Sequence, residues 1–176
     1  MDANEQTKEV YAQFGLAVYL AQVLEHAIVN AMVYLDLIPS KARKVPDAAA
    51  WAKIFDEFME GRFKETLGRL IRMLNALITI PLDLNELLAD SLRRRNWLMH
   101  AYFRERAEMF MTELGRDSML SELQDIQGLL DRTERALDCA MAPIRQRYGF
   151  TDDRLAAYYD EYLRKIRDDE ETGHGL

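Results

Sequence analysis

The sequence has few of the residues that build covalent or metal-bound sites. Cys139 is the only cysteine, which excludes a disulfide framework and a C-x-x-C metal site. Its neighbours on both sides are typical of a helix, so we expect its side chain to pack as a small apolar residue. There is no G-x-x-x-x-G-K-[ST], G-x-G-x-x-G or H-E-x-x-H motif. The sequence therefore predicts no cofactor and no metal.

Positive charge is also in short supply. Lysine and arginine number 23 against 30 acidic residues, a net charge of −7, so the chain as a whole does not attract phosphate. A nucleic-acid site must then be local, and the best local cluster is arginine-rich. Its members are Arg93, Arg94, Arg95, Arg104 and Arg106. The alternative is that these arginines offset neighbouring acids on a solvated face.

Signals for targeting, membrane insertion and a second domain are missing. The first ten residues are polar and acidic, unlike a signal peptide. The most apolar region, about 10–38, is interrupted by polar residues such as Gln22 and Asn30, so we expect no bilayer span and a cytoplasmic location. Without a linker or repeat, we expect one domain over 1–168 and a disordered polar tail over 169–176, which contains His174.

The remaining pattern is helical. Asn-Gly and Asp-Gly turns are absent, and no segment alternates apolar and polar residues for long. The predicted helices are 4–37, 48–60, 64–77, 84–103, 104–114, 118–148 and 152–166. The expected boundary residues are Pro39 and Gly61 as stops, Asp47 and Ser118 as caps, Asp83 with Glu86 as a capping box, and Pro143 as a bend. The fold class is therefore all-α, an up-and-down helical bundle.

The first helix carries apolar residues around most of its circumference. Phe14, Ala17, Ala21 and Leu24 recur at three- and four-residue steps, the period of one helix face. Leu16, Val18, Tyr19 and Leu20 extend apolar character beyond that face. We expect this helix to be buried on one side by its own domain and on another by a second subunit.

The fourth predicted helix, 84–103, carries the most specific polar pattern, Arg95, Asn96, His100 and Tyr102, with the spacing R-N-x-x-x-H-x-Y. Arg95 belongs to an apolar stripe, so it points toward packed helices rather than water. His100 lies five residues later, about 140° around the helix, whereas Asn96 shares its face. Arg95 and His100 therefore do not converge on one point from a single helix, and a second copy of the helix packed against the first is the simple way to bring them together.

A purely architectural interpretation of the same residues is available. A partly buried arginine requires a partner, and Glu25 on the first helix is the carboxylate that we expect to pair with Arg95. Asn96 and His100 would then be polar neighbours in a seam between helices. His26, beside Glu25, is interpreted as an interhelical hydrogen-bonding residue rather than a metal ligand.

The segment Arg95–Tyr102 resembles the R-x(4–6)-H motif of the HEPN superfamily. The form R-x4-H-x-Y is similar to HEPN toxins that pair with a minimal nucleotidyltransferase antitoxin, in which the tyrosine can be modified. The stretches FGLAVYLAQVLEHAIVNAM, TLGRLI and ELGRDSMLSELQDI look like a little-studied HEPN-like group of bacterial proteins. The resemblance covers about residues 10–130. It implies a small all-helical domain that dimerises through the motif helix, and many such domains are metal-independent ribonucleases in toxin–antitoxin, defence or RNA-processing systems.

If the chain is such an enzyme, its catalytic residues are Arg95 and His100. The 2′-OH of RNA supplies the nucleophile, His100 acts as general base or acid, and Arg95 stabilises the phosphate, giving a 2′,3′-cyclic phosphate. Asn96, Tyr102 and Glu25 are supporting residues. Further phosphate contacts would come from Arg93, Arg94 and Arg104.

The competing hypothesis is a non-catalytic helical module that binds a partner and retains the Arg–His motif as architecture. The expected partners across both hypotheses are a second copy of the chain, RNA, and a nucleotidyltransferase-type antitoxin or another protein. The acidic balance favours the module. The position of Arg95 on a packing face beside Asn96 and His100 favours the nuclease.

Overall fold

The computed structural model describes residues 2–171, and within them the chain is helical without a β-strand. It divides into a bundle unit, Met1–Ala140, and a C-terminal unit, Met141–Leu176. The elements are α1 (Ala3–Met32), a π-helix (Val33–Leu37), α2 (Ile38–Lys41), a 3-10 helix (Ala42–Lys44), α3 (Ala48–Phe63), α4 (Leu67–Leu77), α5 (Leu82–His100), α6 (Tyr102–Glu105), α7 (Ala107–Phe110), α8 (Glu113–Arg147) and α9 (Asp152–Glu171). The predicted all-α class is thus confirmed.

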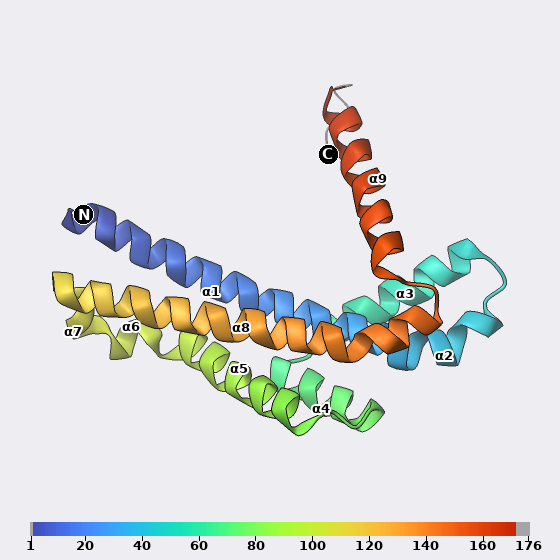
Figure 1. Ribbon diagram of the computed structural model, residues 1–176, viewed down its shortest axis with the longest axis horizontal. Coiled ribbons are helices and arrows are strands. Elements are labelled where there is room, and N and C mark those ends of the chain that lie inside the picture. Colours follow the sequence, from blue (N-terminus) through green and yellow to red (C-terminus); the bar gives the residue numbers. More distant parts are fainter. Residues whose placement is uncertain (1, 172–176) are drawn as a thin grey trace. The chain divides into compact units, whose positions relative to one another are not determined.

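The bundle unit is built around the inner face of α1. Figure 1 shows α1, α5 and α8 running along its length, and α1 also contacts α3 and α4. The core residues of these helices recur at the three- and four-residue steps of one helix face. They include Val10, Ala17, Leu24 and Ile28 of α1, Leu70 and Leu74 of α4, Leu84 and Leu88 of α5, and Met119, Leu123 and Leu130 of α8.

The outer face of α1 is not covered by the rest of the bundle unit. Leu16 and Tyr19 are 42% and 60% exposed although both are large apolar residues. The burial of one side of α1 in its own domain is therefore confirmed. Its burial by a second subunit stays a prediction.

The helical N-terminal segment Ala3–Lys44 is long and apolar enough to cross a bilayer, judged by length and composition. In its most apolar window 44% of the residues are buried, and the core helix of a soluble protein meets the same criterion. The absence of a membrane span and the cytoplasmic location both stay predictions.

The helical segment that begins with α1 was expected to stop at Pro39, but it continues past this residue. A π-helical turn follows α1, and Pro39 then lies in the first turn of α2. Pro39 has no N–H to donate, and it comes directly after the π-helical turn, in which the Ile38 N–H donates to the Val33 carbonyl and the regular α-helical bonding pattern is interrupted. The segment after Pro39, which no predicted helix covers, is helical as far as Lys44.

The next two helices follow the predicted pattern with shifted ends. Asp47 caps α3 as expected, its Oδ1 accepting a hydrogen bond from the Ala50 N–H at 2.8 Å. Gly61 does not end this helix, which continues to Phe63. Thr66 caps α4 by accepting from the Arg69 N–H, so α4 begins later than predicted.

The motif helix differs from expectation at both ends. It begins directly after Pro81, and the Asp83 side chain accepts from its neighbour Leu84 at 2.9 Å, so the predicted Asp83–Glu86 capping box is wrong. It ends at His100, because Ala101 leaves the helical region with φ −137°. Tyr102 consequently opens the separate short helix α6.

The long helix α8 begins at Glu113 rather than after Ser118. Thr112 accepts from the Gly115 N–H at 3.1 Å, whereas the Ser118 hydroxyl donates back to the Leu114 carbonyl. Pro143 lies inside the helix, as predicted, and the bend there stays a prediction. Cys139 is exposed, so its expected packing in the core is wrong.

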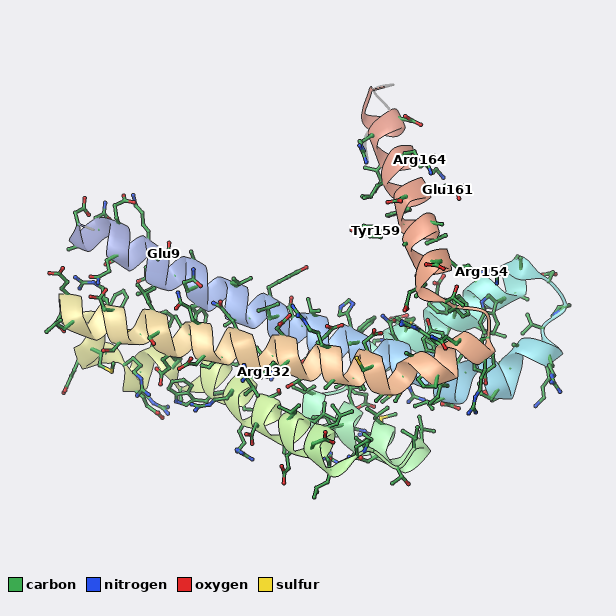
Figure 2. The ribbon with its side chains drawn as sticks, viewed as in Figure 1. Glu9, Arg132, Arg154, Tyr159, Glu161 and Arg164 are labelled. Atoms are coloured by element: carbon green, nitrogen blue, oxygen red, sulfur yellow. The ribbon has the colours of Figure 1, made fainter. Side chains whose placement is uncertain are left out.

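The C-terminal unit contains the end of α8 and the amphipathic helix α9. Gly149, with φ +81°, ends α8 in a left-handed turn in which the Phe150 N–H donates to the Arg145 carbonyl at 3.2 Å. Side chains such as Tyr159, Glu161 and Arg164 project from α9 (Figure 2). This helix continues to Glu171, and residues 172–176, which include His174 and most of the predicted disordered tail, lie outside the described residues.

A close backbone approach at Gly115 gives a first testable prediction. A Cβ added there would overlap the backbone of Met109, which cannot move as a flexible side chain does, whereas Gly61 has open space around it. We expect Gly115→Ala to lower the free energy of unfolding by about 1–3 kcal/mol. Gly61→Ala should instead raise it slightly through better helix propensity. Urea denaturation of both variants measures the difference, and equal effects would contradict the prediction.

Candidate functional site

The helix α5 carries the Arg–His motif on two different faces. Its inner face buries Leu84, Leu88, Ser91 and Leu98 against the bundle. The hydroxyls of Ser91 and Thr133, both buried, are hydrogen-bonded at 2.8 Å and tie α5 to α8. Arg95 lies at the edge of this inner face and is half-buried, as its place in the apolar stripe predicted.

Arg95 pairs with Glu25 on α1. The Arg95 Nη2 and Glu25 Oε1 atoms are 3.1 Å apart, and the two side chains retain 26% and 21% of their exposure. The other terminal nitrogen of Arg95 donates to Asn96 Oδ1 at 3.3 Å. The architectural interpretation of Arg95 predicted this pair, which links α1 to α5 at the margin of the core.

His100 does not join Arg95 within one chain. His100 is the last residue of α5 and is exposed, as is Asn96 one turn before it. Among the described residues, His100 has no hydrogen-bond partner. The five-residue separation directs Arg95 toward α1 and His100 away from the bundle, so a common site would need a second copy of the chain.

Most of the arginine cluster is already neutralised by acids of the same bundle. Arg93 pairs with Asp90, and Arg104 lies 3.6 Å from Glu105. Arg106 makes a two-bond contact with Glu122 at 2.7 and 2.8 Å, and this contact raises the pKa of the Arg106 guanidinium. These pairs support the interpretation of the cluster as charges offset by neighbouring acids.

Arg94 differs from the other four arginines of this cluster because it has no carboxylate partner among the described residues. Its guanidinium lies 5.9 Å from the Trp97 ring. Arg106 approaches the same ring to 4.8 Å, and the Trp97 Nε1–H donates to Glu105 at 2.7 Å. The Trp97 ring, in the last turn of α5, thus lies within cation–π distance of two guanidinium groups.

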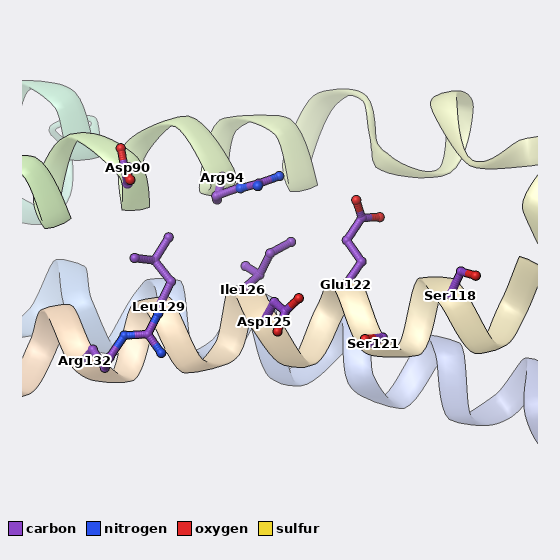
Figure 3. Close-up of a pocket in the computed structure, with 9 residues that line it drawn as sticks. All are labelled: Asp90, Arg94, Ser118, Ser121, Glu122, Asp125, Ile126, Leu129 and Arg132. Carbon is purple, nitrogen blue, oxygen red and sulfur yellow. The ribbon is translucent and has the colours of Figure 1, made fainter.

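The arginine Arg94 also lines an open groove between α5 and α8 of about 480 Å³. Figure 3 shows Arg94 facing α8 while Glu122, Ile126 and Leu129 point from α8 toward α5. The full lining is Asp90, Arg94, Ser118, Ser121, Glu122, Asp125, Ile126, Leu129 and Arg132. An adjoining hollow of about 320 Å³ is lined by Asp90, Arg93, Arg94 and Trp97. Neither includes Arg95, Asn96 or His100, so the groove is separate from the motif.

The groove carries charges of both signs. Arg94 and Arg132 are without an ion-pair partner in the described part of the chain, and so is Asp125. Glu122 is engaged by Arg106. The sequence analysis did not identify this groove, although polar residues at three- and four-residue steps along 118–132 mark the helix face that forms it. Its mixed charge does not suit a polyanion.

Tyr102 is a packing residue. It is 1% exposed, its ring meets Trp97 edge-on at 4.9 Å, and its hydroxyl donates to the Met119 carbonyl at 3.3 Å. Burial raises the pKa of the Tyr102 hydroxyl above its ordinary value, since the low-dielectric surroundings disfavour the phenolate. An enzyme that modified this hydroxyl would first have to open the contact between α6 and α8.

A buried polar network at the N-terminal end of α1 was not predicted. Gln6 and Arg116 are 2% and 7% exposed. Arg116 Nε donates to Gln6 Oε1 at 2.7 Å, and Gln6 donates to Asp117 at 2.5 Å. Gln6 stands among polar and acidic residues at the N-terminus, so the sequence gives no signal that its side chain is buried against Arg116.

The His, Cys, Asp and Glu side chains of the described residues do not form a metal-binding cluster. No group of three His, Cys, Asp or Glu residues suited to a metal occurs among the described residues. His26 is exposed, and its ring lies 4.4 Å from the Phe63 ring of α3. His26 has no hydrogen-bond partner within residues 2–171, so the interhelical bond predicted for it is not seen there.

The Arg95–Glu25 pair leads to a second prediction. Its partial exposure places it between a surface pair and a buried one, so we expect a coupling energy of about 0.5–1.5 kcal/mol. The double-mutant cycle uses Arg95→Gln and Glu25→Gln, with urea denaturation as the measurement. The more exposed Arg93–Asp90 pair, tested as Arg93→Gln and Asp90→Asn, serves as control and should couple less. A larger coupling in the control would contradict the assignment.

The buried Tyr102 hydroxyl gives a third prediction, on alkaline stability. The folded-state pKa is raised, so the contribution of Tyr102 is complete below about pH 10, the ordinary tyrosine value, and is lost as pH rises above it. The loss approaches about 1.4 kcal/mol per pH unit. Tyr102→Phe should flatten this decline, and Tyr159→Phe, which removes an exposed hydroxyl, should not. Urea denaturation of the three proteins between pH 8 and 11 measures how the free energy of unfolding falls with pH. An unchanged fall in Tyr102→Phe would contradict the prediction.

Comparison with known proteins adds no relative. No family model matches the chain, and no curated protein or solved structure matches it. The resemblance to the HEPN superfamily therefore rests on the motif and on the sequence stretches quoted for it.

Proposed function

We propose that this protein is a HEPN-like helical interaction module that works as a homodimer, with Arg95 serving as architecture. The observation that carries the proposal is the Arg95–Glu25 pair at 3.1 Å. A catalytic arginine must present its donors to a phosphate, whereas the donors of Arg95 are directed at Glu25 and Asn96 within the same chain. An RNA phosphate at Arg95 would have to compete with a carboxylate held next to it.

Electrostatics supports the same proposal. Of the arginines expected to contact phosphate, Arg93 and Arg104 each lie within ion-pair distance of an acid, and Arg94 lines a groove that also contains Asp90, Glu122 and Asp125. The chain carries a net charge of −7. A surface of paired charges on an acidic protein attracts RNA weakly and suits a protein partner better.

One observation favours metal-independent RNA cleavage as a second candidate function. Asn96 and His100 are exposed side by side on α5, and the imidazole is unengaged among the described residues. In this mechanism His100 takes the proton from the 2′-OH, the oxygen attacks the adjacent phosphorus, and the 5′-oxygen leaves with a proton. Arg95 of a second copy would have to supply the positive charge, because Arg95 of the same chain points elsewhere.

Partner choice differs between the two candidates. The module requires a second copy and a protein ligand. The nuclease would act on RNA, and as a toxin would be restrained by a protein such as a nucleotidyltransferase-type antitoxin. Tyr102, the residue for such a modification, is buried, which supports a packing role over a regulatory one.

A cleavage assay separates the two functions and is the fourth prediction. We expect end-labelled RNA incubated with the protein and EDTA to remain intact, at the same level for the native chain, His100→Ala and His26→Ala. His26 is a matched control because it is the other exposed histidine in the bundle unit.

The nuclease instead requires a 2′,3′-cyclic phosphate product in EDTA. It also requires a rate loss of about 10²–10⁴-fold in His100→Ala but not in His26→Ala. That result would overturn the module proposal.

A further inference from the structure

The groove between α5 and α8 is long rather than round. Most of its lining residues belong to α8, and they extend from Ser118 to Arg132. Over that span the helix rises by about 21 Å, at about 1.5 Å per residue. A compact metabolite would fill a fraction of this length, whereas about six residues of an extended peptide would span it. The elongated shape therefore favours a peptide segment as the ligand.

The groove contains charges that their own helix leaves without a partner. Elsewhere on α8 an opposite charge lies one turn away, as in the pair of Arg135 with Asp131 at 3.1 Å. No acidic residue lies three or four positions from Arg132, and no basic residue lies three or four positions from Asp125. Neither side chain has an ion pair in the described part of the chain. Both charges are thus available to a ligand.

The guanidinium of Arg132 is folded back along α8 toward the groove. A Cβ placed on Gly128 would lie 3.2 Å from Arg132 Nη1, so the arginine occupies the space that a side chain at position 128 would take. Because Gly128 precedes Arg132 by one helical turn, this conformation directs the positive charge toward Asp125. From the other wall, Arg94 faces the same helix (Figure 3). Within residues 2–171, two cations and one anion without ion pairs line this groove.

We propose that the groove between α5 and α8 binds a peptide segment of the protein partner, and that this segment carries an acidic and a basic residue. This inference rests on the interaction module of the proposed function and names its ligand site. The acidic residue of the peptide pairs with Arg132, the cation of Arg94 adds to the attraction, and the basic residue pairs with Asp125.

The spacing of the charges on α8 sets the spacing in the peptide. Asp125 and Arg132 are seven residues apart, about 10.5 Å along the helix axis. Residues three apart in an extended polyproline-type chain are separated by about 9 Å and lie on one side of it. The acidic and basic residues of the peptide are therefore separated by two others.

The remaining lining residues suit a peptide of mixed charge. Ile126 and Leu129 provide apolar surface between the two charged positions of α8. The hydroxyl oxygens of Ser118 and Ser121 can accept hydrogen bonds from peptide N–H groups. Glu122 remains an acid although it is held within the chain at 2.7 Å, and its charge opposes a purely acidic ligand.

Peptide selection tests the inference on the full chain. The probe is a phage-displayed library of random octapeptides, and we expect the enriched sequences to share an acidic and a basic residue separated by two others. An enriched peptide is then synthesised with a fluorescent label, and its Kd is measured by fluorescence anisotropy. Binding should weaken as salt is added, because the contacts are between partly exposed charges.

Charge reversal identifies the contact. We expect Arg132→Glu to raise the Kd of the selected peptide about tenfold or more, and a peptide with lysine in place of its acidic residue should recover most of the affinity for this variant. Arg135→Glu is the matched control, since it makes the same charge change on the same helix outside the groove lining. It should leave the Kd unchanged. Circular dichroism of both variants confirms that they fold.

Three results would overturn the inference: a selection that enriches no peptide, enriched peptides without the charge pair, or a Kd that Arg132→Glu does not alter. Each would leave the interaction module standing with its ligand surface elsewhere. RNA cleavage that depends on His100 would instead remove the module proposal and leave a measured peptide site in place. The two failures are therefore distinguishable.

Discussion

Everything in the bundle unit depends on the packing of one helix, α1, against three neighbours along its inner face. Val10, Ala17, Leu24 and Ile28 are fully buried there, and burial of side chains of this size contributes about 1.5–3 kcal/mol for each of the larger ones. Because α1 meets α4, α5 and α8 together, its inner face sets where each of them can lie. The polar contacts of Gln6 and Glu25 then fix its rotation and height relative to α8 and α5.

The position of Arg95 shows how one residue can suit two hypotheses that differ completely in chemistry. In a helical bundle, an arginine at the edge of the core always requires an acceptor. Glu25 supplies one from inside the chain, and an RNA phosphate would supply another from outside. The two hypotheses differ in the acceptor of Arg95, and in this chain Glu25 already lies at ion-pair distance.

Helical periodicity was sufficient to predict the fold class, most helices and the burial of the motif stripe, since three- and four-residue spacing directly reports a buried face. It also led to Glu25 as the partner of Arg95. Periodicity failed at helix ends, where local signals compete with packing. Pro39 lies within a helical segment rather than ending it, and the Asp83 side chain bonds to the neighbouring Leu84 N–H. The helix α5 ends at Ala101 although no glycine or proline is present there. The groove between α5 and α8 depends on how two separated helices face each other, which no single-helix pattern contains.

The ties between α5–α6 and α8 restrict how this part of the molecule can move. Ser91 bonds to Thr133, Tyr102 to the Met119 carbonyl, and Arg106 to Glu122. Sliding α5 along α8 by one helical turn, about 5.4 Å, would break all three at once and strand buried polar atoms. These three hydrogen bonds therefore oppose a one-turn slide of α5 along α8. The walls of the groove between these helices are thus held in register by bonds outside the groove itself, and a ligand would bind to a preformed surface.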